Sequence, residues 1–222
     1  GIVVSSAGSE LATIVSALVG ALVATRRSRR AQRTITKLDA LALRKPIHRA
    51  PIAVLGGLLG VLTYRRFGFS LEMFAFGLMI AMCIEQSIID YATHRLPRGV
   101  TFRAAIIGGP LLTLAAINHD DNGRIGVMFA SFVVTLTLFA LLAAFSKGGI
   151  GGGDVRLAPV LAMFLGYLGV KSVVQGLALG FILGGVAATL LLIGGKATRN
   201  TRIAFGPYIA AGSVLTVIFQ SV

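Results

Sequence analysis

Long apolar runs, separated by short polar turns, extend along the whole chain. Eight runs can be marked, at about 2–24, 51–64, 71–90, 101–117, 125–145, 155–170, 172–194 and 203–222. A helix of about 20 apolar residues crosses the ~30 Å hydrocarbon core of a bilayer, and most of the runs reach or approach that length. The runs are continuously apolar and do not alternate, so they predict helices and not barrel strands. The pattern therefore predicts an all-α membrane protein, a polytopic bundle of about eight transmembrane helices.

Composition supports a bilayer as the solvent of this chain. Of its 222 residues, 55% are hydrophobic and only 13% are charged, with a mean hydropathy of +0.86. A soluble domain is nearer one quarter charged, and a chain this apolar could not cover its surface in water. Cys83 is the only cysteine and lies inside an apolar run, which excludes an internal disulfide or a cysteine-based zinc site. We expect residues 1–222 to form a single transmembrane domain.

The net charge of +13 is distributed unevenly between the turns. If all eight runs span, 17 of the 21 lysines and arginines fall on one side, nine of them in a basic loop at about 25–50. Basic residues collect in cytoplasmic loops, so this side is predicted to be cytoplasmic and both termini to lie outside. The basic residues then fix the orientation of the protein in the membrane and contact the lipid bilayer, and no nucleic-acid partner is expected. The opposite side holds four basic residues, namely Arg65, Arg66, Arg124 and Lys171.

Two of the eight acidic residues lie at the predicted cytoplasmic ends of apolar runs. Asp90 ends the third run, and Asp154 precedes the sixth. Ionisable groups at such places are costly and are candidates for function. Two poorly solvated carboxyl groups close together would keep one protonated and one ionised, which is what aspartyl proteolysis requires. Glu85 and Glu10 also lie in apolar runs, but the sequence assigns them no role.

Three consecutive glycines, Gly151, Gly152 and Gly153, come directly before Asp154. Glycine is costly inside a helix but permits close backbone approach, which an extended substrate peptide beside the acid would need. These glycines are therefore candidates for substrate binding. A flexible turn, followed by an aspartate that favours the positive end of a helix, explains the same residues equally well. The residues alone leave both interpretations open.

Four segments together resemble a known family. Gly151-Gly152-Gly153-Asp154 has the GxGD form found in intramembrane aspartyl proteases, and the stretch that begins at Asp90 and reaches Pro97 and Thr101 resembles the first-aspartate motif of prepilin peptidases. Phe205-Gly206-Pro207 is similar to that family's closing segment, and Arg49-Ala50-Pro51-Ile52 loosely resembles its entry to the second span. The four segments occur in the family's order and cover most of the chain.

The resemblance implies Asp90 and Asp154 as the catalytic pair and Gly151 and Gly153 as motif glycines. It implies an aspartic endopeptidase of the bacterial inner membrane, with its active site facing the cytoplasm, that cleaves the leader peptides of type IV prepilin-like precursors. Larger family members carry cysteine pairs for zinc in the first cytoplasmic loop, and loop 25–50 has none. No metal is therefore predicted. S-adenosylmethionine is expected only if the methyltransferase activity of those members is retained.

Two other classes of function remain as alternatives. A small transporter or channel would use intramembrane acids to bind a proton or a cation. No polar ladder continues from Asp90 or Asp154 across a span, and no inverted repeat is evident. A family member that has lost activity and serves only in assembly is the second alternative. The presence of both aspartates argues against it.

Overall fold

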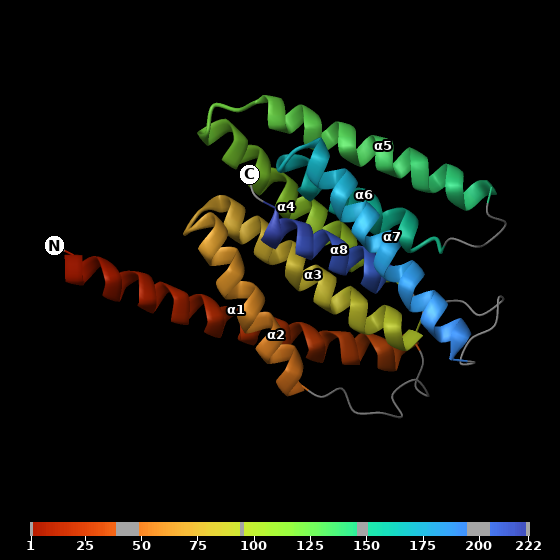
Figure 1. The fold of residues 1–222 in the computed structure, drawn as a ribbon, viewed down its shortest axis with the longest axis horizontal. Coiled ribbons are helices and arrows are strands. Elements are labelled where there is room, and N and C mark those ends of the chain that lie inside the picture. The colour runs from red at the N-terminus through yellow and green to blue at the C-terminus, as the bar shows by residue number, and fades with distance from the viewer. Residues whose placement is uncertain (1, 39–48, 94–95, 146–150, 195–204, 221–222) are drawn as a thin grey trace.

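The computed structural model describes residues 2–38, 49–93, 96–145, 151–194 and 205–220. Within these ranges the chain forms helices and no strand. Figure 1 shows the helices as an elongated bundle, with α1 the longest of them. In chain order they are α1 (Ile2–Leu38), α2 (Arg49–Phe67), α3 (Leu71–Thr93), α4 (Arg98–Asn118), α5 (Gly123–Phe145), α6 (Asp154–Tyr167), α7 (Val170–Ile193) and α8 (Gly206–Phe219).

Each of the eight predicted apolar runs corresponds to one of these helices, which confirms the all-α membrane bundle. Among the described residues, α1, α3, α4, α5 and α7 are long and apolar enough to cross a bilayer. Helices α6 and α8 have only 14 residues each, and α2 carries arginines at both of its ends. The five long helices make this a multi-pass membrane protein.

Helix α6 lies at the centre of the bundle. Twelve of its 14 residues are buried, and it packs against α4, α5, α7 and α8. The outward faces of the surrounding helices expose large apolar side chains, among them Val54, Ile106, Val134 and Leu190. In water such a surface would aggregate, whereas in a bilayer it faces lipid tails.

Helices α1 and α2 approach each other through glycine. A Cβ atom on Gly20 would overlap the carbonyl oxygen of Gly56, and one on Gly60 would lie 2.6 Å from the carbonyl oxygen of Ser16. Small residues at such an interface let two backbones come close and gain dispersion contacts, which is the main attraction available between helices in lipid. The first two helices are therefore held as a pair.

The basic stretch 25–50, predicted to be a loop, is helical as far as Leu38. Ala24, Ser28, Ala31 and Ile35 are buried along one face of this part of α1, and Ala31 and Ile35 pack against Ile89 of α3. Spacings of four and three residues are typical of a helix that packs on another helix. The prediction of a loop was wrong for residues 25–38, because small residues between the arginines supply a packing face. Residues 39–48 lie outside the described residues.

Candidate functional site

Asp90 and Asp154, from different helices, lie at the same end of the bundle. Asp90 is in the last turn of α3 and is 5% exposed, and Asp154 is the first residue of α6 and is 8% exposed. Asp154 lies outside the five candidate spans. Burial and then the neighbouring Asp90 carboxylate raise the pKa of Asp154 to about 6, against a backbone hydrogen bond from Gly151 that lowers it. The two acids are therefore close enough to interact electrostatically across 64 positions of sequence.

The glycine turn places Asp154 at the start of its helix. The Asp154 amide donates a hydrogen bond to the Gly151 carbonyl at 3.0 Å, and the Leu157 amide donates to the Gly153 carbonyl at 3.0 Å. Gly151 and Gly152 are exposed, and a Cβ on Gly152 would meet no atom within 4 Å. The backbone beside Asp154 is thus accessible at these two glycines.

Leu96 brings together three of the four segments that carry the family resemblance. A Cβ on Gly153 would lie 2.7 Å from the Leu96 Cβ, and a Cβ on Gly206 would lie 3.2 Å from the Leu96 Cδ1. The same Cβ on Gly206 would lie 2.8 Å from the Asp90 Oδ2. Gly153 and Gly206 are therefore small because Leu96 and Asp90 occupy the space beside them. For Gly153 this is a packing role, which the sequence argument did not foresee.

Gln86 fixes the segment that follows Asp90. It lies one helical turn before Asp90 on α3 and is completely buried. Its side-chain nitrogen donates hydrogen bonds to the Thr101 hydroxyl at 2.6 Å and to the Pro97 carbonyl at 3.3 Å. These bonds tie the start of α4 to the end of α3 around Leu96. The sequence argument singled out Pro97 and Thr101 but missed Gln86, whose four-residue spacing from Asp90 was a usable signal.

Glu85 and Arg27 form an ion pair that sequence reasoning also missed. The Arg27 Nη1 donates to the Glu85 Oε2 at 2.6 Å, and the Glu85 side chain is 1% exposed. This contact joins the basic part of α1 to α3, five positions before Asp90. A lone acid in an apolar run predicts a buried partner, but nothing in the sequence says which of 21 basic residues it is.

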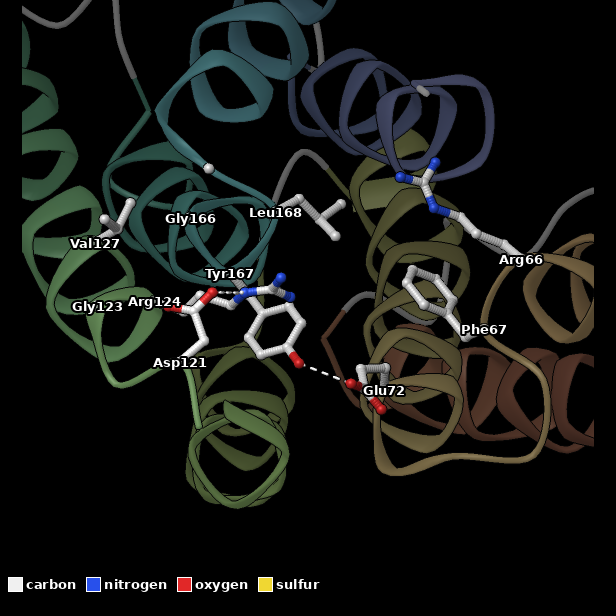
Figure 2. Close-up of a pocket in the computed structure, with 11 residues that line it drawn as sticks. Arg66, Phe67, Glu72, Asp121, Gly123, Arg124, Val127, Gly166, Tyr167 and Leu168 are labelled. Carbon is white, nitrogen blue, oxygen red and sulfur yellow. Dashed lines mark hydrogen bonds and ion pairs between the residues drawn. The ribbon is translucent and has the colours of Figure 1, made fainter. Parts of the chain in front are cut away.

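A second polar cluster occupies the opposite end of the bundle. Glu72, about 27 Å from Asp90 along α3 at 1.5 Å per residue, accepts hydrogen bonds from Tyr167 at 2.7 Å and His119 at 2.8 Å. Beside it is a cavity of about 420 Å³ (Figure 2), well away from the acid pair. The part of the chain that the structure describes holds no group of three potential metal-ligating side chains.

Some residues of the motif segments and of the basic turns lie outside the described residues. These are 94–95 in the stretch that begins at Asp90, 146–150 before the three glycines, and 195–204 between the last two apolar runs. The other acids assigned no role are accounted for as far as the structure describes them: Glu10 is exposed, and Asp121 pairs with Arg124 at 2.7 Å. Asp90 and Asp154 therefore remain the candidate catalytic pair.

Comparison with known proteins places these residues in a family. The sequence profile of the type IV leader peptidase family matches residues 73–193, which include both Asp90 and Asp154. The prepilin leader peptidase/N-methyltransferase of Bacillus subtilis is 29% identical over 155 residues, covering 69% of this chain and 59% of that protein. Proteins of the same name from Xanthomonas campestris and Burkholderia pseudomallei are 28% and 32% identical, over 72% and 65% of this chain and 54% and 46% of their own lengths.

The chain thus spans about half the length of these curated relatives. No solved structure matches it. The family profile alone covers more than half of the chain. The protein belongs to the type IV leader peptidase family.

Proposed function

We propose that this protein is an intramembrane aspartyl endopeptidase that cleaves the leader peptides of type IV prepilin-like precursors. The observation that carries the proposal is the convergence of two buried carboxyl groups, Asp90 and Asp154, at one end of a membrane bundle. Membership of the type IV leader peptidase family and the names of the relatives support the substrate class. The whole chain, 1–222, serves in this proposal as one peptidase domain.

The two acids share one proton in this proposal, because burial and mutual repulsion disfavour the ionisation of both. The protonated acid donates a hydrogen bond to the oxygen of the scissile carbonyl. The ionised acid takes a proton from a water molecule, whose oxygen forms a bond to the carbonyl carbon. The tetrahedral intermediate then collapses as the carbon–nitrogen bond breaks, and the departing amine receives the proton that the ionised acid had taken.

The surroundings of the pair suggest how a peptide reaches it. The precursor's apolar helix would dock against the exposed apolar side chains of the bundle, and its leader junction would unwind at the acids. Gly151 and Gly152 present exposed backbone next to Asp154, which suits an extended peptide, while Gly153 packs against Leu96. We therefore assign Gly151, Gly152 and Gly153 to substrate binding, with Gly153 acting through Leu96.

The distribution of basic residues supports a cytoplasmic site. The arginine-rich part of α1 reaches the acid-pair end of the bundle through Arg27 and its contact with Glu85. By the positive-inside rule this end faces the cytoplasm, and the protein resides in the bacterial inner membrane. The cytoplasm is also the side of the membrane on which precursor leaders are synthesised.

The methyltransferase activity in the relatives' names is not part of the proposal. S-adenosylmethionine would be needed only if that activity is retained, and the proposal assigns no residue to it. No step of the proposed reaction uses that cofactor or a metal. Cys83, the single cysteine of the chain, is buried inside α3 and is no substitute for paired zinc ligands.

The proposal is tested by cleavage of a co-expressed prepilin, measured as the fraction of precursor converted to mature protein. We expect Asp90→Asn and Asp154→Asn each to lower the cleavage rate by at least about a thousandfold, as removal of a catalytic group does. Asp120→Asn is the matched control, because Asp120 is an exposed acid in the α4–α5 turn and its positive φ of 54° is tolerated by asparagine. Rapid cleavage by either catalytic variant contradicts the assignment.

A further inference from the structure

The cavity at the opposite end of the bundle has no part in the proposed proteolysis. It lies where the α2–α3, α4–α5 and α6–α7 turns meet, and its walls include Arg66, Phe67, Glu72, Arg124, Tyr167 and Leu168. Its volume is about 420 Å³, within the range of small-ligand sites. In Figure 2, Arg66 lies on one side of Leu168, and Arg124 lies with Tyr167 on the other.

The two acids that line the cavity are already paired. Glu72 accepts hydrogen bonds from the Tyr167 hydroxyl at 2.7 Å and from His119 at 2.8 Å. Asp121 accepts a hydrogen bond from Arg124 at 2.7 Å, and the Arg124 guanidinium also stacks over the Tyr167 ring at 5.1 Å. Among the described residues, neither carboxylate pairs with Arg66, so Arg66 is the cation of this cavity that its walls leave uncompensated.

Two donor atoms of the Arg66 guanidinium are buried without a partner among the described residues. Its Nε and Nη2 atoms are buried and have no hydrogen-bond partner in the described part of the chain, and its guanidinium lies over the Phe67 ring at 5.3 Å. These two nitrogens form one edge of the guanidinium, the edge that binds two oxygens of a phosphate or carboxylate at once. Leaving charged donors unpaired in a buried place is costly, so a bound oxyanion would stabilise the protein.

The surroundings favour a phosphate that carries acyl chains. Phe69 and Val170, which follow closely on the lining residues Phe67 and Leu168, are 82% and 62% exposed. The cavity also lies at the ends of α3, α5 and α7, three of the candidate spans, where lipid head groups are expected. We propose that Arg66 and this cavity bind the phosphate group of a phospholipid head group, with the lipid's chains on the adjoining apolar surface. The inference is independent of the proposed peptidase function.

The test uses the full chain, purified in a non-ionic detergent, and its thermal unfolding midpoint. Dioctanoyl phosphatidylglycerol is titrated in, and dioctanoylglycerol, which lacks the phosphate, serves as the matched ligand. We expect the phospholipid to raise the midpoint and the diacylglycerol to leave it unchanged. Arg66→Gln should weaken the apparent phospholipid affinity by about tenfold or more, which is typical of losing a charged hydrogen-bond partner. Arg65→Gln removes the same charge from an exposed neighbour and should bind as the wild type does.

Further variants and ligands distinguish a lipid site from a general phosphate site. Arg66→Lys keeps the charge but lacks the two-donor edge, so it should also bind more weakly, and it replaces Arg66→Gln if that variant does not fold. Inorganic phosphate that binds as tightly as the phospholipid would support the oxyanion site and overturn its assignment to lipid. Equal loss of affinity in the Arg65 and Arg66 variants, or no phosphate-dependent rise in the wild type, would overturn the proposal.

Discussion

Arg27 and Glu85, 58 residues apart in the chain, form an ion pair with 2.6 Å between Nη1 and Oε2. The Arg27 side chain is 22% exposed and the Glu85 side chain only 1%, so the carboxylate depends on this arginine for its charge compensation. Because Glu85 precedes Asp90 on α3, the pair also fixes the position of α1 relative to the helix that carries a proposed catalytic acid. The basic segment therefore has a structural role in addition to topology.

Removal of the arginine alone should be strongly destabilising. We expect Arg27→Met to lower the free energy of unfolding by about 3 kcal/mol, because it leaves a buried carboxylate uncompensated. The double variant Arg27→Met with Glu85→Leu should recover most of that loss, since no buried charge remains. Arg26→Met, at an exposed neighbouring position, is the control. Thermal unfolding in detergent measures all of these, and equal effects of the Arg26 and Arg27 variants would contradict the role of the pair.

Stability should depend on pH through Asp154. Its folded-state pKa is raised from an ordinary 3.8 to about 6, so the folded protein holds this proton more tightly than the unfolded chain does. The stabilising contribution of Asp154 is therefore complete below about pH 4 and is lost as the pH rises through about 6, by about 3 kcal/mol in total. Asp154→Asn, which mimics the protonated acid, should lack this contribution and be more stable than the wild type at neutral pH. The difference between the two unfolding free energies, measured from pH 4 to pH 7.5, checks the prediction.

The difference in unfolding free energy between the wild type and Asp154→Asn should therefore change with pH. A difference that stays constant from pH 4 to pH 7.5 would show that Asp154 does not titrate in this range. Asp120→Asn is the control, because this exposed acid should not produce the same pH-dependent gain. Its unfolding free energy should follow that of the wild type from pH 4 to pH 7.5.

Gly206 should be intolerant of a side chain. A Cβ at this position would lie 2.8 Å from the Asp90 Oδ2 and 3.2 Å from the Leu96 Cδ1, closer than ordinary van der Waals contact. We expect Gly206→Ala to displace the Asp90 carboxyl group and lower prepilin cleavage by about a hundredfold, since small misplacements of catalytic groups have effects of that size. Gly185→Ala is the matched control, because a Cβ there meets no atom within 4 Å. Full activity of the Gly206 variant would show that the acid pair tolerates movement.

The helices were predictable because each apolar run is long and ends in polar residues. The burial of the two acids at one end of the bundle was also predictable, since a carboxyl group at the end of such a run is rare and costly, while their catalytic role stays a prediction. The continuation of α1 to Leu38 was not predicted. Ser28, Ala31 and Ile35 are buried at helical spacing, but the arginines between them make the segment read as a polar loop. A charge count places residues on a side of the membrane but does not say whether they are helical.

The partners of buried polar groups could not be derived from the sequence. Glu85 could pair with any of several arginines, and the choice of Arg27 depends on how α1 crosses α3. The cluster of Glu72, His119 and Tyr167 likewise joins three helix ends that are far apart in the chain. The packing of Gly153 against Leu96 was missed for a related reason, because the side chain that requires a small residue there comes from another segment. Such contacts depend on packing between helices, which periodicity does not encode.

Gln86 provides a test of whether the segment after Asp90 must be held in place. Replacement by leucine removes both of its hydrogen bonds, to Thr101 at 2.6 Å and to the Pro97 carbonyl at 3.3 Å, and leaves a buried hydroxyl and carbonyl without this donor. We expect Gln86→Leu to lower the free energy of unfolding by about 1–3 kcal/mol. Leu96 would then be less well fixed beside Asp90, so prepilin cleavage should fall as well. Thermal unfolding and the cleavage assay report these two effects separately.

The matched variant Thr101→Val keeps the shape of the side chain and removes only the shorter of the two hydrogen bonds. Its effect on both measurements should be in the same direction and smaller, because the Pro97 carbonyl still binds Gln86. A Gln86→Leu protein that unfolds earlier but cleaves as fast as the wild type, when assayed well below its unfolding midpoint, would assign Gln86 to the fold alone. A parallel fall in cleavage in both variants, at a temperature where both are folded, would place the hydrogen-bonded start of α4 among the features that position Asp90 for catalysis.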